Sequence, residues 1–356
     1  MSEYYEIDFL GVESAKSGDA ITLRYKANGR ETIHVVDGGY LDTGTKIVEH
    51  LNQFYGSVVI DHVVLTHPDQ DHANGLRTVV ETCEVRNLWI NRPWEYADQL
   101  LPRFANYNSV EALKRKLRDV YSATAELETI ALERGISINS PLQGAAIGEF
   151  TVLAPSLNRY LDLVAESGRT PEIVEDHGAG SIFERVALAA KAVTNYIRSV
   201  WGHETFPPTG TSNENEMSVV QTALLKGERI LLTGDAGRET LKEAADYAEA
   251  TGINLPGIDL FQVPHHGGRH NVSTEILDRL LGKRLSQQPE KTTFSAICSA
   301  AKADEDHPRK AVVRAMLHRG AHFSCTNGQV VRKANGIDRP GWRAIPQVAY
   351  PEDQEE

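Results

Sequence analysis

The sequence predicts an α/β protein, because apolar strand-like runs alternate with amphipathic helix-like runs towards both of its ends. The 356 residues include 41% apolar and 24% charged residues, the composition of a globular protein with a sizeable core. Such a length fits one large α/β domain with insertions, or two domains. We expect one domain built from residues 1–91 and 206–350, a mainly helical insertion at 92–205 and a frayed acidic tail at 351–356.

The first ninety residues alternate strands with helices. Strands are expected where apolar and β-branched residues cluster, at residues 5–10, 20–25, 32–36 and 58–65. Amphipathic periodicity predicts helices at residues 45–54 and 73–82. A His/Asp-rich segment, residues 66–72, therefore falls on a strand-to-helix loop, where α/β proteins usually place their chemistry.

The middle of the chain has a different character. Long helical patterns with interspersed Lys and Glu, such as residues 110–132, dominate 92–205, and one short strand-like piece lies at 150–153. The loop at 206–213, marked by Pro, Gly and Asn, returns the chain to alternation.

The second half again alternates strands and helices. Strands are expected at residues 217–225, 229–232, 258–263, 293–298 and 321–324. Helices are expected from residue 236 to 250, and at 274–281 and 309–319.

Charge and cysteine content limit the classes of function. The formal charge of −12 disfavours a broad, non-specific grip on DNA or RNA, although a local basic patch stays open. The three cysteines include no close pair, as expected for a reducing, cytoplasmic setting. We see neither a leader peptide nor an apolar run long enough to span a membrane, so no membrane role is expected.

The segment 66–72 has the density of a metal-binding loop. His67, Asp69, Asp71 and His72 place two imidazoles and two carboxylates at the end of a strand. This mixture suits zinc, manganese or iron, and four ligands on one loop could serve two adjacent ions. The alternative is a solvated polar loop in which Asp71 caps the following helix.

Two further clusters repeat this placement. Asp235 follows the strand at 229–232, and His265 and His266 follow the strand at 258–263, both with flanking glycines that let the backbone approach an ion closely. Asp235 alone could be a helix cap, and a lone His-His pair is often a surface feature. The three clusters together predict a metal site shared between distant parts of the chain.

The order of these motifs resembles the metallo-β-lactamase superfamily and, more narrowly, the nuclease-like domain of the ComEC competence proteins. The matching segments are residues 66–72, 215–220, 231–235, 264–268 and 306–308, which cover both ends of the chain and not its helical middle. The resemblance implies an αββα sandwich with two divalent metal ions and an activated water that attacks phosphorus or a carbonyl carbon.

The resemblance also implies roles for single residues. His67 and Asp69 would bind one ion, Asp71 and His72 the other, and Asp235 would bridge both. His265 or His266 would complete the ligand set of the second ion and leave its neighbour for proton transfer or substrate contact, and the sequence leaves open which one is the ligand. We expect Asp71, His266 and His307 to take part in catalysis, and Asn215, Ser218 and His307 to contact the substrate.

The sequence departs from the superfamily's commoner pattern in two places. Asp69 stands where a second histidine is usual, so the site is richer in oxygen and shifts towards manganese relative to zinc. No convincing motif supplies the histidine that often precedes the bridging Asp, although His177 and His203 exist, and Asn215 or Ser218 could take its place. Asp37, in an early Asp-Gly-Gly turn, is expected to support the metal loop by hydrogen bonds.

The predicted function is metal-dependent hydrolysis, with a nucleic-acid or nucleotide phosphodiester as the leading substrate. One alternative is hydrolysis of a lactone, β-lactam or cyclic nucleotide, and another is a non-catalytic scaffold that binds a protein partner through the helical insertion. The insertion holds a concentration of basic residues, namely Arg103, Lys114, Arg115, Lys116 and Arg118. If these follow a path to the metals, a nucleic-acid strand is favoured, and if they lie on a remote helix face, small substrates are favoured.

Overall fold

The computed structural model describes residues 3–12, 16–170 and 200–354, and contains two mixed β-sheets. The strands of the first sheet are, in spatial order, β14 (Val331–Asn335), β1 (Tyr4–Phe9), β2 (Ala20–Ala27), β3 (Arg30–Gly38), β4 (Val59–Val64), β5 (Glu84–Trp89) and β6 (Ser137–Asn139). Strands β14 to β3 pair antiparallel, and β3 to β6 pair parallel.

The second sheet repeats this mixed design. Its strands are, in spatial order, β13 (Ala321–Cys325), β12 (Phe294–Cys298), β11 (Leu260–Gln262), β10 (Glu228–Leu232), β9 (Val220–Leu225), β8 (Phe150–Ala154) and β7 (Ala146–Ile147). Strands β13 to β10 are parallel, and β10 to β7 are antiparallel. In each sheet the parallel strands need helical crossovers, and these supply the outer layers.

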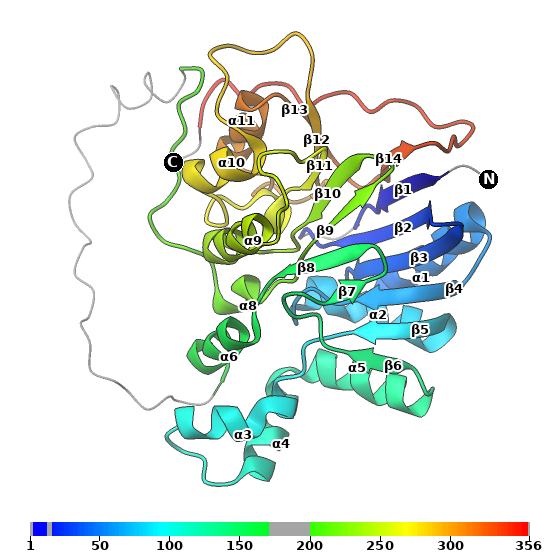
Figure 1. The fold of residues 1–356 in the computed structure, drawn as a ribbon, viewed down its shortest axis with the longest axis vertical. Helices are drawn as coiled ribbons and strands as arrows, with labels where there is room; N and C mark the ends of the chain where they lie inside the picture. The colour runs from blue at the N-terminus through cyan, green and yellow to red at the C-terminus, as the bar shows by residue number, and fades with distance from the viewer. Residues whose placement is uncertain (1–2, 13–15, 171–199, 355–356) are drawn as a thin grey trace.

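Helices cover the outer face of each sheet (Figure 1). On the first sheet lie α1 (Leu41–His50), which continues as the π-helix η1 (Leu51–Tyr55), together with α2 (Gln70–Thr82) and α5 (Ser122–Glu133). On the second sheet lie α9 (Arg238–Ala250), α10 (Thr274–Leu281) and α11 (Lys310–His318). A separate apolar cluster fills the space between the sheets, with Ile7, Leu23 and Val64 on one side and Phe150 and Ile230 on the other. These layers form the αββα sandwich that was predicted.

Two-residue turns set the register of the hairpins. Asn28 and Gly29 join β2 to β3, and Lys226 and Gly227 join β9 to β10, and all four have positive φ. Positive φ at both central residues defines the type I′ turn, whose twist matches that of paired strands.

The described part of residues 92–205 contains strands as well as helices. Its helices are η2 (Pro93–Tyr96), α3 (Ala97–Leu100), η3 (Leu101–Arg103), α4 (Val110–Val120), α5 and α6 (Leu157–Glu166). Strand β6 extends the first sheet, and β7 and β8 extend the second. This segment is therefore part of the sandwich, because the short strand-like piece at 150–153 is strand β8 of the second sheet. Helices α3, α4 and α6 share a further apolar cluster with η2 and Met217, and α3 and α4 lie at the lower end of Figure 1.

The C-terminal segment contacts the body of the protein through Gln354. Its side-chain amide donates to the His203 carbonyl at 2.8 Å and accepts from the Thr205 N–H at 3.1 Å. Within the described ranges, no helix has the length and apolar character required to cross a lipid bilayer. Cys83, Cys298 and Cys325 are free and buried.

Candidate metal centre

The three sequence clusters meet at one edge of the sandwich. The β4–α2 loop and the first turn of α2 carry His67, Asp69, Asp71 and His72. Asp235 lies between β10 and α9, and the His265-His266 pair lies in η4 (Pro264–Gly267), directly after β11. All follow carboxyl ends of strands, where the loops of α/β sheets gather functional groups.

Neither Asp71 nor Asp235 caps the helix that follows it. The N-cap of α2 is Asp69, without a side-chain cap hydrogen bond, so Asp71 lies inside the helix. The N-cap of α9 is Gly237, two residues beyond Asp235. The capping alternatives therefore do not account for Asp71 or Asp235.

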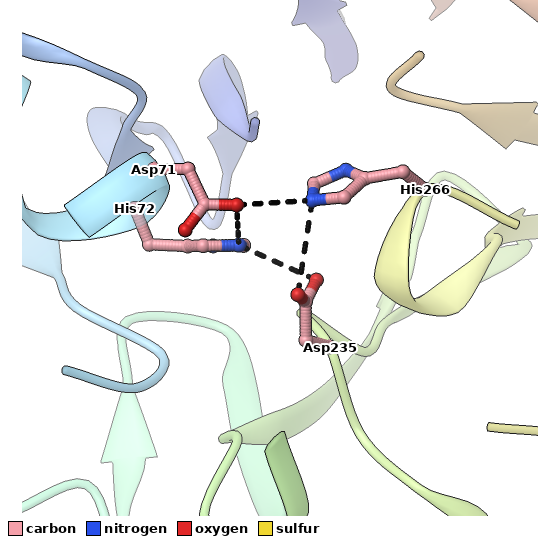
Figure 2. A group of neighbouring side chains, drawn as sticks. All are labelled: Asp71, His72, Asp235 and His266. Atoms are coloured by element: carbon pink, nitrogen blue, oxygen red, sulfur yellow. Dashed lines mark ion pairs between the residues drawn. The ribbon is translucent and has the colours of Figure 1, made fainter. Parts of the chain in front are cut away.

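Asp71, His72, Asp235 and His266 form one compact group whose ligand-type atoms all lie within 4.8 Å of one another (Figure 2). His72 Nε2 lies 3.3 Å from Asp235 Oδ1 and 3.8 Å from Asp71 Oδ2. His266 Nε2 lies 3.4 Å from Asp71 Oδ2 and 3.7 Å from Asp235 Oδ2. The side chains of these residues reach the same point from three separate elements.

A second group shares Asp235. His67 Nε2 lies 3.7 Å from Asp69 Oδ2 and 3.8 Å from Asp235 Oδ2. Asp235 Oδ1 faces His72, and Asp235 Oδ2 faces both His67 and His266. One carboxylate thus contacts both groups, the arrangement that a bridging ligand requires.

The histidines are oriented by their other ring nitrogen. His72 Nδ1 donates to Asp37 Oδ2 at 2.7 Å, and His266 Nδ1 donates to the Ser299 carbonyl at 2.9 Å. His67 Nδ1 lies 3.1 Å from Thr66 Oγ1. Metal-binding histidines have this pattern, with one nitrogen fixed by a hydrogen bond and the other presented to the ion.

The residues fit divalent metal ions. The Nε2 atoms of His67, His72 and His266 and the Oδ1 atom of Asp235 are buried and have no hydrogen-bond partner. Leaving four converging polar atoms unsatisfied costs stability, so such groups in a native fold call for an ion or water. Tetrahedral ligands at 2.0–2.1 Å from zinc lie about 3.4 Å apart, close to the separations seen here.

The electrostatics of the group favour a cation. Burial opposes ionisation of Asp235, but the neighbouring imidazoles of His72, His265 and His266 hold the pKa of that carboxyl well below its usual range. Burial also opposes the charged form of His266, yet Asp235 and Asp71 raise its pKa to about 9. The carboxylates therefore remain ionised, and a divalent ion would replace protons held by the imidazoles.

Asp37 supports the metal loop as expected. Its Oδ1 accepts from the Thr66 N–H at 2.8 Å, and its Oδ2 accepts from the Thr66 hydroxyl at 2.7 Å and from His72. A Cβ on Gly75 would lie 1.9 Å from the Gly38 carbonyl oxygen, so glycine is required where α2 passes the end of β3. This close approach brings His72 to Asp37.

The sequence interpretation missed a buried clasp between the two halves of the site. Asp19 Oδ2 accepts from Gln262 Nε2 at 2.9 Å, and Gln262 Oε1 accepts from the N–H groups of Thr233 at 2.8 Å and Gly234 at 3.1 Å. The Asp19 N–H donates to the Asp71 carbonyl at 3.2 Å. Asp19 thus connects the loop of Asp71 to the loop of Asp235.

His265 is placed differently from His266. Its Nδ1 hydrogen bonds to Asp235 Oδ2 and lies 3.3 Å from Asn215 Nδ2, and its side chain is 31% exposed. Both histidines have positive φ, a strained conformation for a residue with a side chain. His266, which is buried, belongs to the compact group, and His265 is the more exposed of the two.

Ser218 and Asn215, two of the residues expected to contact the substrate, are buried and hydrogen bond to the loops around the centre. Ser218 is fully buried and its Oγ accepts from the Asp235 N–H at 3.1 Å. Asn215 is 4% exposed and donates from Nδ2 to Thr211 Oγ1 at 2.7 Å. Neither residue is among those that line the cleft over the centre.

A cleft of about 550 Å³ opens over the centre, and we call it the main cleft. Asp69, Asp71, His265, His266 and His307 are among the residues that line it. His307 Nδ1 lies 3.2 Å from Asp304 Oδ2, and its ring lies 5.7 Å from that of His265. Burial and the neighbouring histidines lower the pKa of His307, so the structure places a neutral imidazole beside the centre.

Two residues of the main cleft had no signal in the sequence. Arg169 Nη1 lies 2.8 Å from Asp69 Oδ1, and its side chain is half exposed. Asp304 Oδ2 accepts from the Ser17 hydroxyl at 2.7 Å as well as facing His307. Arg169 supplies a cation next to Asp69, and Asp304 fixes the ring of His307.

The remaining histidines and the basic residues of the insertion lie elsewhere. His203 Nε2 pairs with the Thr205 hydroxyl, and His177 is outside the described residues. None of the five basic residues noted in the sequence lines the main cleft. Arg103 pairs with Asp162 at 2.6 Å, and Arg118 pairs with Glu128 and stacks over Trp94.

Comparisons with known proteins give matches among solved structures only. No family model matches the chain, and no curated protein matches it. Similar structures include the metallo-β-lactamase fold protein YhfI from Bacillus subtilis, with 10% identity, 93% of this chain and all of that chain covered, and a TM-score of 0.41.

Two further matches are partial. A variant of the CmlA β-hydroxylase has 13% identity and a TM-score of 0.42, with 94% of this chain and 54% of that chain covered. The hydrolase AbOPH of the β-lactamase superfamily has 10% identity and a TM-score of 0.32, with 61% of this chain and 56% of that chain covered. This chain thus spans only about half the length of these two proteins. The αββα assignment depends on the chain's own layers and strand order, and not on these matches.

Proposed function

We propose that the protein is a dinuclear metallohydrolase that cleaves phosphodiesters of nucleotide size. The observation that carries the proposal is the convergence below an open cleft of four buried ligand atoms that have no hydrogen-bond partner, from His67, His72, Asp235 and His266. Such a set is better explained by metal binding than by packing, because a buried polar atom without a hydrogen bond lowers the stability of the fold.

The proposed ligand sets follow the two groups. His67, Asp69 and Asp235 would hold one ion, and Asp71, His72, His266 and Asp235 the other. When bound, the ions would supply Lewis acidity and lower the pKa of a water molecule, with zinc and manganese both compatible with these donors. Arg169 would contact a substrate oxygen from the side of Asp69.

The residues at the rim would handle protons. His307 Nδ1 is held by Asp304, which leaves Nε2 of this neutral ring to accept a proton from the attacking water in the main cleft. Asp235 and the clasp of Asp19 would keep the two groups at a fixed separation. A phosphodiester is preferred over a carbonyl substrate because of the motif resemblance to ComEC nuclease-like domains and the cation beside the centre.

The test is hydrolysis of single-stranded DNA, duplex DNA, RNA and cyclic nucleotides in manganese and zinc buffers. We expect Asp71→Ala and Asp235→Ala to abolish hydrolysis while circular dichroism stays unchanged. Asp246→Ala is the control for loss of one acidic charge, since Asp246 is 60% exposed and pairs with Arg279, and neither residue lines the main cleft. Activity that survives in both variants would refute the proposal.

Hydrolysis of a small ester, such as a lactone or β-lactam, is the second candidate. The observation that favours small substrates is the absence of Arg103, Lys114, Arg115, Lys116 and Arg118 from the lining of the main cleft. A strand-binding nuclease would be expected to place such residues along a path to the metals. Hydrolysis of a lactone or β-lactam, without cleavage of any phosphodiester, would support this candidate. A protein that binds no metal would instead support the scaffold alternative.

A further inference from the structure

A second cleft adjoins the main cleft behind two histidines. This side cleft of about 360 Å³ is lined by residues 210–212, His265, 268–271, His307 and Arg309. His265 and His307 line both clefts, and their rings lie 5.7 Å apart. A ligand in the side cleft would therefore be separated from the metal group by about one imidazole ring.

The two clefts differ in charge. The main cleft includes four carboxylates among its lining residues, namely Asp69, Asp71, Asp304 and Asp306. The side cleft includes Arg269, His270 and Arg309, and no carboxylate among its described lining residues. In a chain with a formal charge of −12, such a cationic lining is suited to an anionic ligand.

The lining of the side cleft is anchored to the metal centre. The Asn271 side chain donates from Nδ2 to the Asp235 carbonyl at 2.8 Å, and a Cβ on Gly268 would lie 2.6 Å from His265 Cδ2. The Arg309 N–H donates to the Gly267 carbonyl at 3.1 Å. Backbone segments that carry Arg269 and Arg309 are therefore fixed relative to the two histidines.

The polar groups of the lining match a phosphate. His270 Nδ1 faces the Thr209 carbonyl at 3.1 Å, which leaves the other ring nitrogen for a ligand. Arg309 pairs with Asp306 at 2.9 Å, but that carboxylate is 71% exposed, so the pair is weak and a bound anion can replace it. Guanidinium groups bind phosphate oxygens with good geometry.

We propose that the side cleft is a subsite for a second phosphate group of the substrate, next to the phosphodiester that is cleaved. This inference rests on the proposed function and refines it. The preferred substrate would be a short oligonucleotide, or the end of a strand, that carries another phosphate beside the scissile one. A phosphodiester without a second phosphate would use the main cleft alone.

The first experiment compares dinucleotides. Thymidylyl-thymidine is offered without a terminal phosphate, with a 5′-phosphate and with a 3′-phosphate, and bis(4-nitrophenyl) phosphate serves as a one-phosphate substrate. We expect one phosphorylated dinucleotide to have a kcat/KM about tenfold or more above that of the unphosphorylated one. Arg269→Ala and Arg309→Ala should remove this preference through KM, Arg309→Lys should retain part of it, and hydrolysis of the one-phosphate substrate should be unchanged.

The control variant is Lys242→Ala, which removes one positive charge from an exposed position beside a different groove. It should keep the preference. Equal hydrolysis of phosphorylated and unphosphorylated dinucleotides by the wild-type protein would overturn the inference while leaving the proposed function intact. An equal loss in all three alanine variants would overturn it too, because only overall charge would then matter.

A second experiment does not depend on activity. Calorimetric titration of the metal-free protein with inorganic phosphate should give binding that weakens about tenfold in Arg269→Ala and Arg309→Ala and stays unchanged in Lys242→Ala. If no phosphodiester is hydrolysed, the proposed function is refuted. The titration would still test whether the side cleft binds phosphate. Phosphate binding that is the same in all variants would refute the subsite.

Discussion

Asp235→Asn tests the shared carboxylate most directly. The substitution keeps the shape of the side chain and removes its charge from a point that faces His72 at 3.3 Å, His266 at 3.7 Å and His67 at 3.8 Å. A contact with a charged group contributes about 1.5–3 kcal/mol, so each ion should bind roughly 10- to 150-fold more weakly. Since Asp235 contacts both groups, the affinities of both ions should fall.

The assay is metal content after dialysis, followed by calorimetric titration with zinc and with manganese. We expect the wild-type protein to bind two ions per chain and Asp235→Asn to retain one or none. Asp306→Asn serves as the control for loss of one acidic charge at the same cleft, because Asp306 is 71% exposed and lies outside the metal group. Two ions bound with unchanged affinity in Asp235→Asn would refute the bridging role.

Three further changes probe the support of the site and the fold. Asp19→Ala should weaken metal binding by about 10- to 100-fold in titrations, because Gln262 loses its acceptor in the clasp, and unaltered affinity would exclude a positioning role. Ser218→Ala leaves the buried Asp235 N–H without its acceptor and should lower the free energy of unfolding by about 1–3 kcal/mol in urea. A raised KM at unchanged stability would instead support the substrate contact that the sequence predicts for Ser218. Glu204, whose side chain is buried against Arg319, has its pKa held at about 2 rather than 4.5 despite burial, by His318 and Arg319. The ionised carboxylate stabilises the fold above pH 4.5, and this stabilisation is lost as the pH falls towards 2. Glu204→Gln should therefore lower the free energy of unfolding by about 3 kcal/mol at pH 7 and by much less near pH 2 in denaturant titrations. A difference that does not depend on pH would contradict this.

The sandwich could be predicted because most of its strands are buried on at least one face. Residues 59–64 and 260–262, for example, read as short apolar runs between turn residues, and both are strands at the predicted positions. Strand β14 gave no such signal, since only Val331 is buried and the four residues after it, Arg332 to Asn335, are charged, small or polar. Its pairing with β1 spans almost the whole chain, and no local pattern encodes it.

The candidate site could be predicted as a set of motifs but not as a geometry. His67 to His72 stand out because metal-ligand residue types crowd one loop. Asp19 and Gln262 do not, because a buried polar pair 243 residues apart looks like two unrelated polar residues in the sequence. Arg169 and Asp304 were likewise invisible, since each gains its meaning only from a neighbour that the fold brings to it.

Backbone strain adds an argument that the arrangement serves a function rather than packing. Asp37, His265 and His266 all have positive φ, and none is a glycine. A non-glycine residue in that region costs about 1–3 kcal/mol, and glycine would remove the cost at each position. The chain instead keeps side chains that face the same centre, two of them as neighbours in one turn. Three of the six non-glycine residues with positive φ in the described part of the chain thus lie at this centre. Strain at residues that hold or orient the ligand atoms is expected when ligand geometry, and not stability alone, determines which residue occupies each position.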